Sequence, residues 1–259
     1  MTNDLFSLRG RVALVTGGSR GIGRMIAKGF IDQGARVYIS SRKADVCEQT
    51  AKELSAGGGQ CIALPVDASN KEGIQALVSA YARHETKLDI LVNNAGAAWL
   101  AEFDEFPEKG WDKVVDLNLK TPFFLTQAFA SALRAAATAD KPSKVINIAS
   151  IDGISVNPQE TYSYAASKAG LIHLTRRMAL RLIQDHIVVS AIAPGAFASD
   201  MNTTARDHGD EVARRIPARR IGTDEDMAGA AIYLASRAGD YVVGNTLVVD
   251  GGVSDARGG

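Results

Sequence analysis

The chain has 259 residues, of which 46% are hydrophobic and 22% are charged, so it holds enough apolar material for one large domain or two small ones. Lys plus Arg and Asp plus Glu number 29 each, so the formal net charge is zero and no chain-wide field favours nucleic acid or an anionic membrane as a partner. The first residues lack the basic and apolar regions of a signal peptide, and no run reaches the roughly 20 apolar residues of a membrane span, so we expect a cytoplasmic protein.

Short apolar runs alternate with helix-forming stretches along the whole chain. The first run, residues 12–15, has no polar alternation, as expected for a parallel strand covered on both faces. A helix is predicted next, from about residue 22 to residue 33, and Gly34 should end it. The other runs are residues 37–39, 61–64, 90–92, 145–148, 188–192 and 247–249. This alternation predicts an α/β protein with one domain over residues 1–259, built as a doubly wound, seven-stranded parallel sheet with helices on both faces.

The two cysteines, Cys47 and Cys61, fall in a predicted helix and a predicted strand and have no metal-like spacing. We therefore expect idle or buried thiols and no metal site.

A glycine-rich turn, residues 16–23, follows the first predicted strand. In doubly wound sheets, ligands bind beyond the carboxyl ends of the strands, where the strand order reverses. Gly17, Gly21 and Gly23 would let the backbone turn sharply and approach a pyrophosphate, whose charge would rest on the N-terminus of the following helix. The spacing, Gly-x-x-x-Gly-x-Gly, differs from the usual dinucleotide fingerprint, and a merely structural turn is the alternative.

The end of the second predicted strand indicates which dinucleotide would bind. NAD-binding domains place an acid there for the ribose 2′-hydroxyl, but residues 40–42 contain no carboxylate. Ser41 could donate to a 2′-phosphate, Arg42 could pair with it, and Arg20 of the glycine-rich turn could reach it from the other side. The sequence therefore favours NADP(H) over NAD(H), unless both arginines are ordinary surface residues.

Tyr164 and Lys168 are four positions apart, so on a helix they share one face. A cation beside the phenol favours the phenolate, as does oxidised nicotinamide, so we expect the pKa of Tyr164 to move from its usual value near 10 toward neutral pH, as a general acid/base requires. Tyr162 has no such partner, because Ala166 stands four positions on. Ser150, at the end of the fifth predicted strand, is either a catalytic hydroxyl or a turn residue.

The glycine-rich turn and the Tyr-x-x-x-Lys pair resemble the motifs of the classical short-chain dehydrogenases/reductases, and the resemblance extends over nearly the whole chain. It implies a Rossmann fold and hydride transfer between NADP(H) and a carbonyl or alcohol carbon. Ser150 would hold the substrate oxygen, Tyr164 would deliver the proton, and Lys168 and Asn118 would complete the catalytic set.

The resemblance also implies a set of residues that contact the cofactor. Asp67 matches the acid at the adenine amino group, and residues 93–96 match the Asn-Asn-Ala-Gly signature, whose role could equally be structural. Ser199 stands where the family has a threonine. The expected cofactor contacts are Gly17, Ser19, Arg20, Gly21, Ile22, Gly23, Ser41, Arg42, Asp67, Asn94, Ala95, Gly96, Tyr164, Lys168, Pro194, Gly195, Phe197 and Ser199.

Pro122 lies four residues after Asn118 in a predicted helix and lacks an N–H, so the carbonyl of Asn118 should lose its helical partner. The freed carbonyl could hold a water that touches Lys168 and extend a proton path to solvent. A kink that serves only packing is the alternative.

The substrate is less constrained than the reaction. Residues 196–221 carry five arginines that could attract an acidic substrate or a phosphopantetheine carrier, or could simply be solvated, and Asp152 either faces the substrate or caps a turn. The chain is most similar to NADPH-dependent β-ketoacyl reductases, particularly the branch associated with rhamnolipid formation, which implies a 3-oxoacyl substrate bound to coenzyme A or to a carrier protein. Leu180 replaces an arginine of the carrier-dependent reductases, which counts against a carrier protein.

Two alternatives remain. Residues 6–11 resemble gluconate 5-dehydrogenases, which implies a sugar-acid or polyol dehydrogenase, and a non-catalytic NADP-sensing regulator is the more distant possibility. Residues 111–137 and 161–185 carry more apolar side chains than one sheet face should bury, and in the resembled family such helices pair between subunits, so we expect a homotetramer.

Overall fold

The computed structural model describes residues 5–256. Seven parallel strands form one sheet in the order β3-β2-β1-β4-β5-β6-β7, so the strand order reverses between β1 and β4. The strands are β1 (Val12–Thr16), β2 (Arg36–Ser40), β3 (Gln60–Leu64), β4 (Ile90–Asn93), β5 (Ser143–Ile148), β6 (Ile187–Pro194) and β7 (Thr246–Val249). Each apolar run identified in the sequence lies in one of these strands, and the predicted doubly wound sheet is confirmed.

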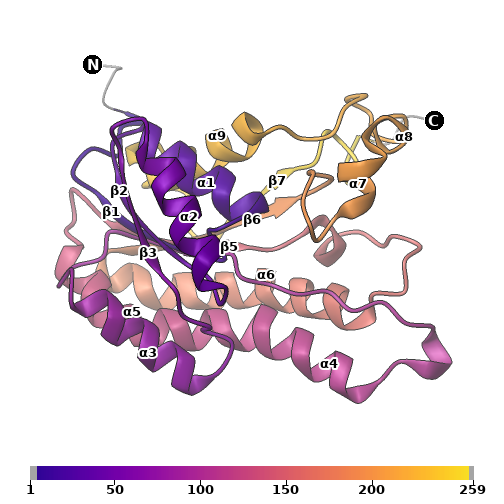
Figure 1. The fold of residues 1–259 in the computed structure, drawn as a ribbon, viewed down its shortest axis with the longest axis horizontal. Helices are drawn as coiled ribbons and strands as arrows, with labels where there is room; N and C mark the ends of the chain where they lie inside the picture. The colour runs from indigo at the N-terminus through magenta and orange to yellow at the C-terminus, as the bar shows by residue number, and fades with distance from the viewer. Residues whose placement is uncertain (1–4, 257–259) are drawn as a thin grey trace.

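Helices cover both faces of the sheet (Figure 1). Helices α1, α2 and α9 lie on one face and α3, α4, α5 and α6 on the other, while α7 and α8 lie beyond the carboxyl ends of β6 and β7. Their bounds are α1 (Gly21–Asp32), α2 (Ala44–Ser55), α3 (Lys71–Ala82), α4 (Glu108–Val115), α5 (Thr121–Ala136), α6 (Tyr162–Leu182), α7 (Thr203–Asp207), α8 (Gly209–Ala213) and α9 (Asp224–Ala235). Short 3₁₀ turns occur at Phe103–Glu105 (η1), Ile151–Gly153 (η3), Ile183–Asp185 (η4) and Arg237–Gly239 (η5).

The core has two main layers, because side chains of successive strand residues point to opposite faces of the sheet. Val15 of β1 packs with Phe30 of α1 in one layer, and Leu14 of β1 packs with Phe129 of α5 in the other. All four side chains are essentially inaccessible to solvent. This two-sided burial explains why the strands are continuous apolar runs.

Helix α1 ends as predicted, since Gly34 adopts a left-handed φ of 89° directly after the helix.

The predicted break in the helix near Pro122 is a π-helical turn and not a simple kink. A π-helical turn, η2 (Asp116–Lys120), separates α4 from α5, and the N–H of Thr121 bonds to the carbonyl of Asp116, five residues back. Such π-turns are rare and frequently lie at functional sites.

No helix among residues 5–256 is both long and apolar enough to cross a membrane. The same residues contain no group of three or more His, Cys, Asp or Glu side chains placed to hold a metal ion. Cys47 is buried in α2 and Cys61 lies partly buried in β3, and both thiols are free.

Candidate active site

The glycine-rich turn connects β1 to α1 at the carboxyl edge of the sheet. Gly17 and Gly21 have φ values of 64° and 50°, which side chains other than glycine rarely adopt. A Cβ on Gly23 would come 2.5 Å from the Asn94 amide nitrogen. The sequence therefore needs glycine at these positions, and the backbone can approach a bound group closely at the first turn of α1.

Asn94 and Thr16 hold this turn against the end of β4. The Asn94 amide donates to the carbonyls of Thr16 and Gly17, at 2.8 and 3.2 Å. The Thr16 hydroxyl accepts from the backbone N–H groups of Asn94 and Ala95, at 3.0 and 3.1 Å, and donates to the Val92 carbonyl. The side chain of Asn94 thus fixes the glycine-rich turn. Gly96, two residues after Asn94, packs closely on the Asn118 side chain. A Cβ at position 96 would come 3.2 Å from the Asn118 side chain, so a small residue is needed there.

The end of β2 also faces the glycine-rich turn, because the N–H of Gly18 bonds to the carbonyl of Ser40. Ser41 is partly buried and Arg42 is exposed directly after this strand. No carboxylate stands at the end of β2, where it would repel a phosphate. A glycine cradle, the N-terminus of α1 and these two donors fit a dinucleotide that carries a 2′-phosphate.

Arg20 makes a contact that the sequence did not indicate. Its guanidinium lies 2.6 Å from a carboxylate oxygen of Asp200, and the other oxygen of Asp200 accepts from Arg206 at 2.9 Å. Asp200 belongs to the segment between β6 and α7, so this ion pair joins that segment to the glycine-rich turn. Nearby, a Cβ on Gly21 would come 3.2 Å from the Ser199 side chain.

The remaining residues of the expected cofactor set lie along the same edge of the sheet. Asp67 is exposed after β3 and accepts from the N–H of Ser69. Ser19 is buried in the glycine-rich turn, and Ile22 packs against the core layer that contains Val15. Pro194 ends β6, and Gly195 donates its N–H to Val249 of β7.

Phe197 and Ser199 also have contacts of their own within the chain. The Phe197 ring belongs to the core and packs against Gly222, and the backbones of the two residues form an isolated parallel bridge. The Ser199 hydroxyl accepts from the N–H of Asn202, at the start of α7, in this structure.

Ser150, Tyr164 and Lys168 come together at the junction of β5 and α6. Ser150 directly precedes η3 and is buried, and its hydroxyl is hydrogen-bonded to the Tyr164 hydroxyl. Lys168 is buried one turn along α6 from Tyr164, with its ammonium 5.5 Å from the centre of the Tyr164 ring and 2.7 Å from the carbonyl oxygen of Ile148. A serine hydroxyl, a phenol and a buried ammonium are thus gathered at one junction, and such a set can bind a ligand oxygen and move a proton to it.

The pKa of Tyr164 differs from the lowered value that the sequence predicts. Burial raises it to about 12, and the hydrogen bond from Ser150 only partly opposes that rise. Burial also lowers the pKa of Lys168 to about 8. The expected lowering of the Tyr164 pKa by Lys168 is therefore wrong for the chain by itself, because desolvation outweighs the neighbouring cation.

Asn118 lies in the π-helical turn, and its side chain is almost completely buried. The amide bonds in both directions to the backbone of Ala97, at 2.9 and 2.8 Å, and also donates to the Ser167 hydroxyl at 3.2 Å. The side chain of Asn118 therefore joins the segment after β4 to α6, next to Lys168.

Tyr162, the tyrosine without a lysine partner, lies outside this group. Its hydroxyl donates to Glu160, and its ring makes edge-to-face contacts with Phe103 and Phe106. It is partly exposed at the start of α6.

The arginines of residues 196–221 mostly have partners of their own. Arg206 pairs with both Asp200 and Asp207, and Arg220 pairs with Asp226. Arg219 donates to the carbonyl of Arg214. This segment therefore presents less free positive charge than its composition indicates.

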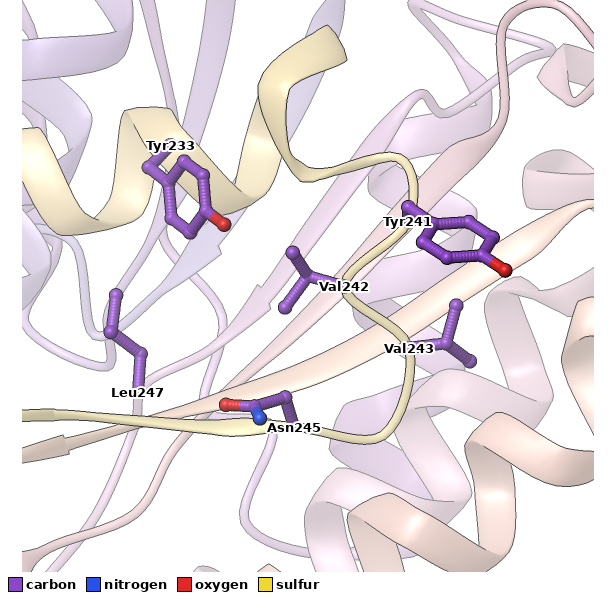
Figure 2. Close-up of a pocket in the computed structure, with 6 residues that line it drawn as sticks. All are labelled: Tyr233, Tyr241, Val242, Val243, Asn245 and Leu247. Carbon is purple, nitrogen blue, oxygen red and sulfur yellow. The ribbon is translucent and has the colours of Figure 1, made fainter.

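A pocket beside the edge strand β7 lies apart from these residues (Figure 2). It is lined by Tyr233, Tyr241, Val242, Val243, Asn245 and Leu247. Its side chains are apolar, phenolic or amide, and none of these six residues is a carboxylate, lysine, arginine or histidine.

Comparisons with known proteins agree with this geometry. A family model described as enoyl-(acyl carrier protein) reductase matches residues 17–254. The rhamnolipids biosynthesis 3-oxoacyl-[acyl-carrier-protein] reductase of Pseudomonas aeruginosa is 46% identical over 250 residues, which cover 95% of this chain and 97% of the relative. The 5-keto-D-gluconate 5-reductase of Escherichia coli is 36% identical over 256 residues, which cover 97% and 98%. Among solved structures, an RhlG/NADP active-site complex of Pseudomonas aeruginosa is similar with a TM-score of 0.94 at 44% identity, covering 98% of this chain and 100% of that chain.

Proposed function

The chain belongs to the short-chain dehydrogenase/reductase family, and from this premise we propose that it is an NADP(H)-dependent reductase of 3-oxoacyl thioesters. The observation that carries the proposal is the junction of β5 and α6, where Ser150, Tyr164 and Lys168 lie together. The similarity to a 3-oxoacyl reductase and to an RhlG/NADP complex supports the choice of substrate and cofactor.

We propose that the glycine-rich turn, Ser41, Arg42 and the other residues along the carboxyl edge of the sheet hold NADP(H), which supplies the hydride. Ser150 and Tyr164 hold the carbonyl oxygen of the substrate, and Tyr164 donates the proton that makes it a hydroxyl. Lys168 lies beside Tyr164 as a buried cation, and the main-chain carbonyl of Asn118 holds a water that returns a proton from solvent. The buried Asn118 side chain supports this role by fixing the π-helical turn.

The experiment that tests the proposal assays the purified protein with NADPH against acetoacetyl-CoA and 5-ketogluconate in parallel. We expect turnover of acetoacetyl-CoA. Turnover of 5-ketogluconate alone would instead support the second candidate, a sugar-acid dehydrogenase, which the similarity to a 5-keto-D-gluconate reductase favours. NADPH binding without turnover of any ketone would support a sensor, although a sensor has no need to keep the catalytic side chains together.

The acyl carrier is either coenzyme A or a carrier protein. Leu180 is 64% exposed on α6, where an arginine would suit an acidic carrier, while Arg176 and Arg177 are exposed on the same helix. Comparing acetoacetyl-CoA with the corresponding carrier-protein thioester distinguishes the two.

We also propose a homotetramer and a cytoplasmic location. Two separate surfaces expose large apolar side chains, one over α4, α5, α6 and η4 and one beside the edge strand β7 and its pocket (Figure 2). The exposed residues are Trp111, Phe123, Phe124, Leu180, Ile183, Tyr241 and Val243. Two different self-complementary surfaces would generate a tetramer with two-fold axes. Light scattering at micromolar concentration tests the proposed tetramer, and a monomer would contradict it.

The two free thiols suit a reducing compartment, which supports the proposed cytoplasmic location.

A further inference from the structure

Asp152 lies in η3, the 3₁₀ turn between the catalytic serine and helix α6. Its backbone N–H donates to the Ser150 hydroxyl at 3.1 Å. The next residue, Gly153, packs so closely on α6 that a Cβ would come 2.6 Å from the carbonyl carbon of Lys168. The position of Asp152 is therefore fixed between Ser150 and Lys168 and does not depend on a mobile loop.

The carboxylate of Asp152 is partly buried and has no hydrogen bond or ion pair with any residue between 5 and 256. Its charge adds to the larger effect of burial in raising the pKa of the Tyr164 phenol, which agrees with the backbone contact that places Asp152 beside Ser150. The carboxylate is thus a negative charge without a partner close to the position of the substrate oxygen. An unpaired charge next to a ligand site discriminates strongly between ligands of different charge.

Arginines of the glycine-rich turn and of residues 196–221 already pair with other carboxylates. Arg20 and Arg206 are paired with Asp200, and Arg220 is paired with Asp226. The Lys168 ammonium lies 5.5 Å from the centre of the Tyr164 ring and donates to the Ile148 carbonyl. Asp152 has no partner of this kind among residues 5–256, so a second carboxylate entering beside it would meet an unpaired negative charge in a partly desolvated place, where repulsion is stronger than in water.

We propose that Asp152 determines specificity by making the site select uncharged 3-oxo thioesters over free 3-oxo acids. This rests on the proposed function. When Ser150 and Tyr164 hold the 3-oxo oxygen, the acyl carbon two positions away carries either a neutral thioester or a carboxylate. Only the carboxylate is repelled by Asp152. The free acid released by hydrolysis of the thioester would therefore be a poor substrate, and the enzyme would act on the activated acyl group.

The test compares two substrates that share one ketone, the N-acetylcysteamine thioester of acetoacetate and acetoacetate itself, both with saturating NADPH. The wild-type ratio of kcat/KM should favour the thioester by about 10- to 100-fold, as expected for two like charges near one another in a medium of intermediate dielectric. Asp152→Asn has the same shape without the charge. It should lower that ratio at least about 10-fold, chiefly by improving acetoacetate.

Two variants serve as controls. Asp152→Glu keeps the charge and should keep the preference, and Glu160→Gln removes a carboxylate that is already bonded to Tyr162 and should leave the ratio unchanged. An unchanged dissociation constant for NADPH shows that each variant is folded. If Asp152→Asn reduces the thioester but leaves the ratio at its wild-type value, the role of Asp152 is wrong while the proposed function stands. If the wild type reduces neither the thioester nor acetoacetyl-CoA, the proposed function fails and this inference fails with it.

Discussion

Replacing Lys168, the lysine of the proposed catalytic set, should make the protein more stable and inactive at the same time. Lys168 is buried in the core of the site, and its ammonium bonds to a single protein acceptor, the Ile148 carbonyl. Burial lowers its pKa from 10.5 to about 8. Because the unfolded chain holds this proton more tightly than the folded protein, the charged lysine opposes folding at neutral pH.

The size of the effect follows from the pKa difference. At about 1.36 kcal/mol per pH unit, the difference between 10.5 and about 8 corresponds to about 3 kcal/mol at pH 7. Lys168→Met removes this cost but leaves the Ile148 carbonyl without its donor, which costs about 1 kcal/mol. The variant should therefore gain about 2 kcal/mol in free energy of unfolding, and turnover should be lost because the cation beside Tyr164 is gone.

The pH dependence separates this explanation from better packing. Wild-type stability should rise as the pH increases from about 8 to 10.5, where the unfolded chain is protonated at Lys168 and the folded protein is not. Above 10.5 the lysine is neutral in both states, so the advantage of Lys168→Met should disappear. Urea unfolding at pH 7 and pH 11, at one fixed protein concentration, measures both values.

A second buried lysine provides the control. Lys144 is also buried, and burial lowers its pKa too, but its ammonium lies 2.7 Å from a carboxylate oxygen of Asp240, which opposes that shift. Lys144→Met would leave Asp240 without its partner and should destabilise the protein by about 1–3 kcal/mol. The reasoning is refuted if Lys168→Met is no more stable than the wild type at pH 7, or if its gain is the same at pH 11.

Three further predictions concern the site. Tyr164→Phe should lower turnover by at least about 10²-fold with little change in NADPH affinity, whereas Tyr162→Phe should remain active; the opposite result would mean that the catalytic tyrosine is misassigned. Arg42→Ala should weaken NADPH binding by roughly 10- to 150-fold and leave NADH binding unchanged in fluorescence titrations, and equal weakening of both would remove the argument for a 2′-phosphate site. Gly23→Ala places a Cβ 2.5 Å from an amide nitrogen and should cost about 1–3 kcal/mol in thermal unfolding, while Gly57→Ala meets open space and should cost less than about 0.5 kcal/mol; similar effects would contradict the packing of the turn.

The strands could be predicted from the sequence because each is buried on both faces and is therefore an uninterrupted apolar run. The end of α1 was equally predictable, since Gly34 adopts the left-handed conformation that helix ends favour. The sequence did not predict the form of the helix break near Pro122. A missing N–H indicates that a hydrogen bond is lost, but neighbouring packing decides whether the backbone kinks or widens into a π-turn, and here the N–H of Thr121 bonds to Asp116.

Contacts between distant segments were the hardest to predict. Arg20 and Asp200 are 180 positions apart, and nothing local to either residue indicates their pairing. The fold brings them together because both follow the carboxyl ends of parallel strands. The sequence thus identified Arg20 as a group that could meet a phosphate, but not the carboxylate that it contacts in the structure.

The pKa of Tyr164 shows why chemistry is harder to predict than position. A lysine four residues on is visible in the sequence, and it indicates a phenol with a lowered pKa. The burial of both side chains at the junction of β5 and α6 is a property of the fold, and desolvation penalises the phenolate and the ammonium alike. Both shifts favour the uncharged forms, a phenol and an amine, over the pair of charges that the motif indicates. A bound ligand would therefore have to supply the electrostatic stabilisation that the buried phenolate lacks, and of the two side chains only the charged lysine opposes folding at neutral pH.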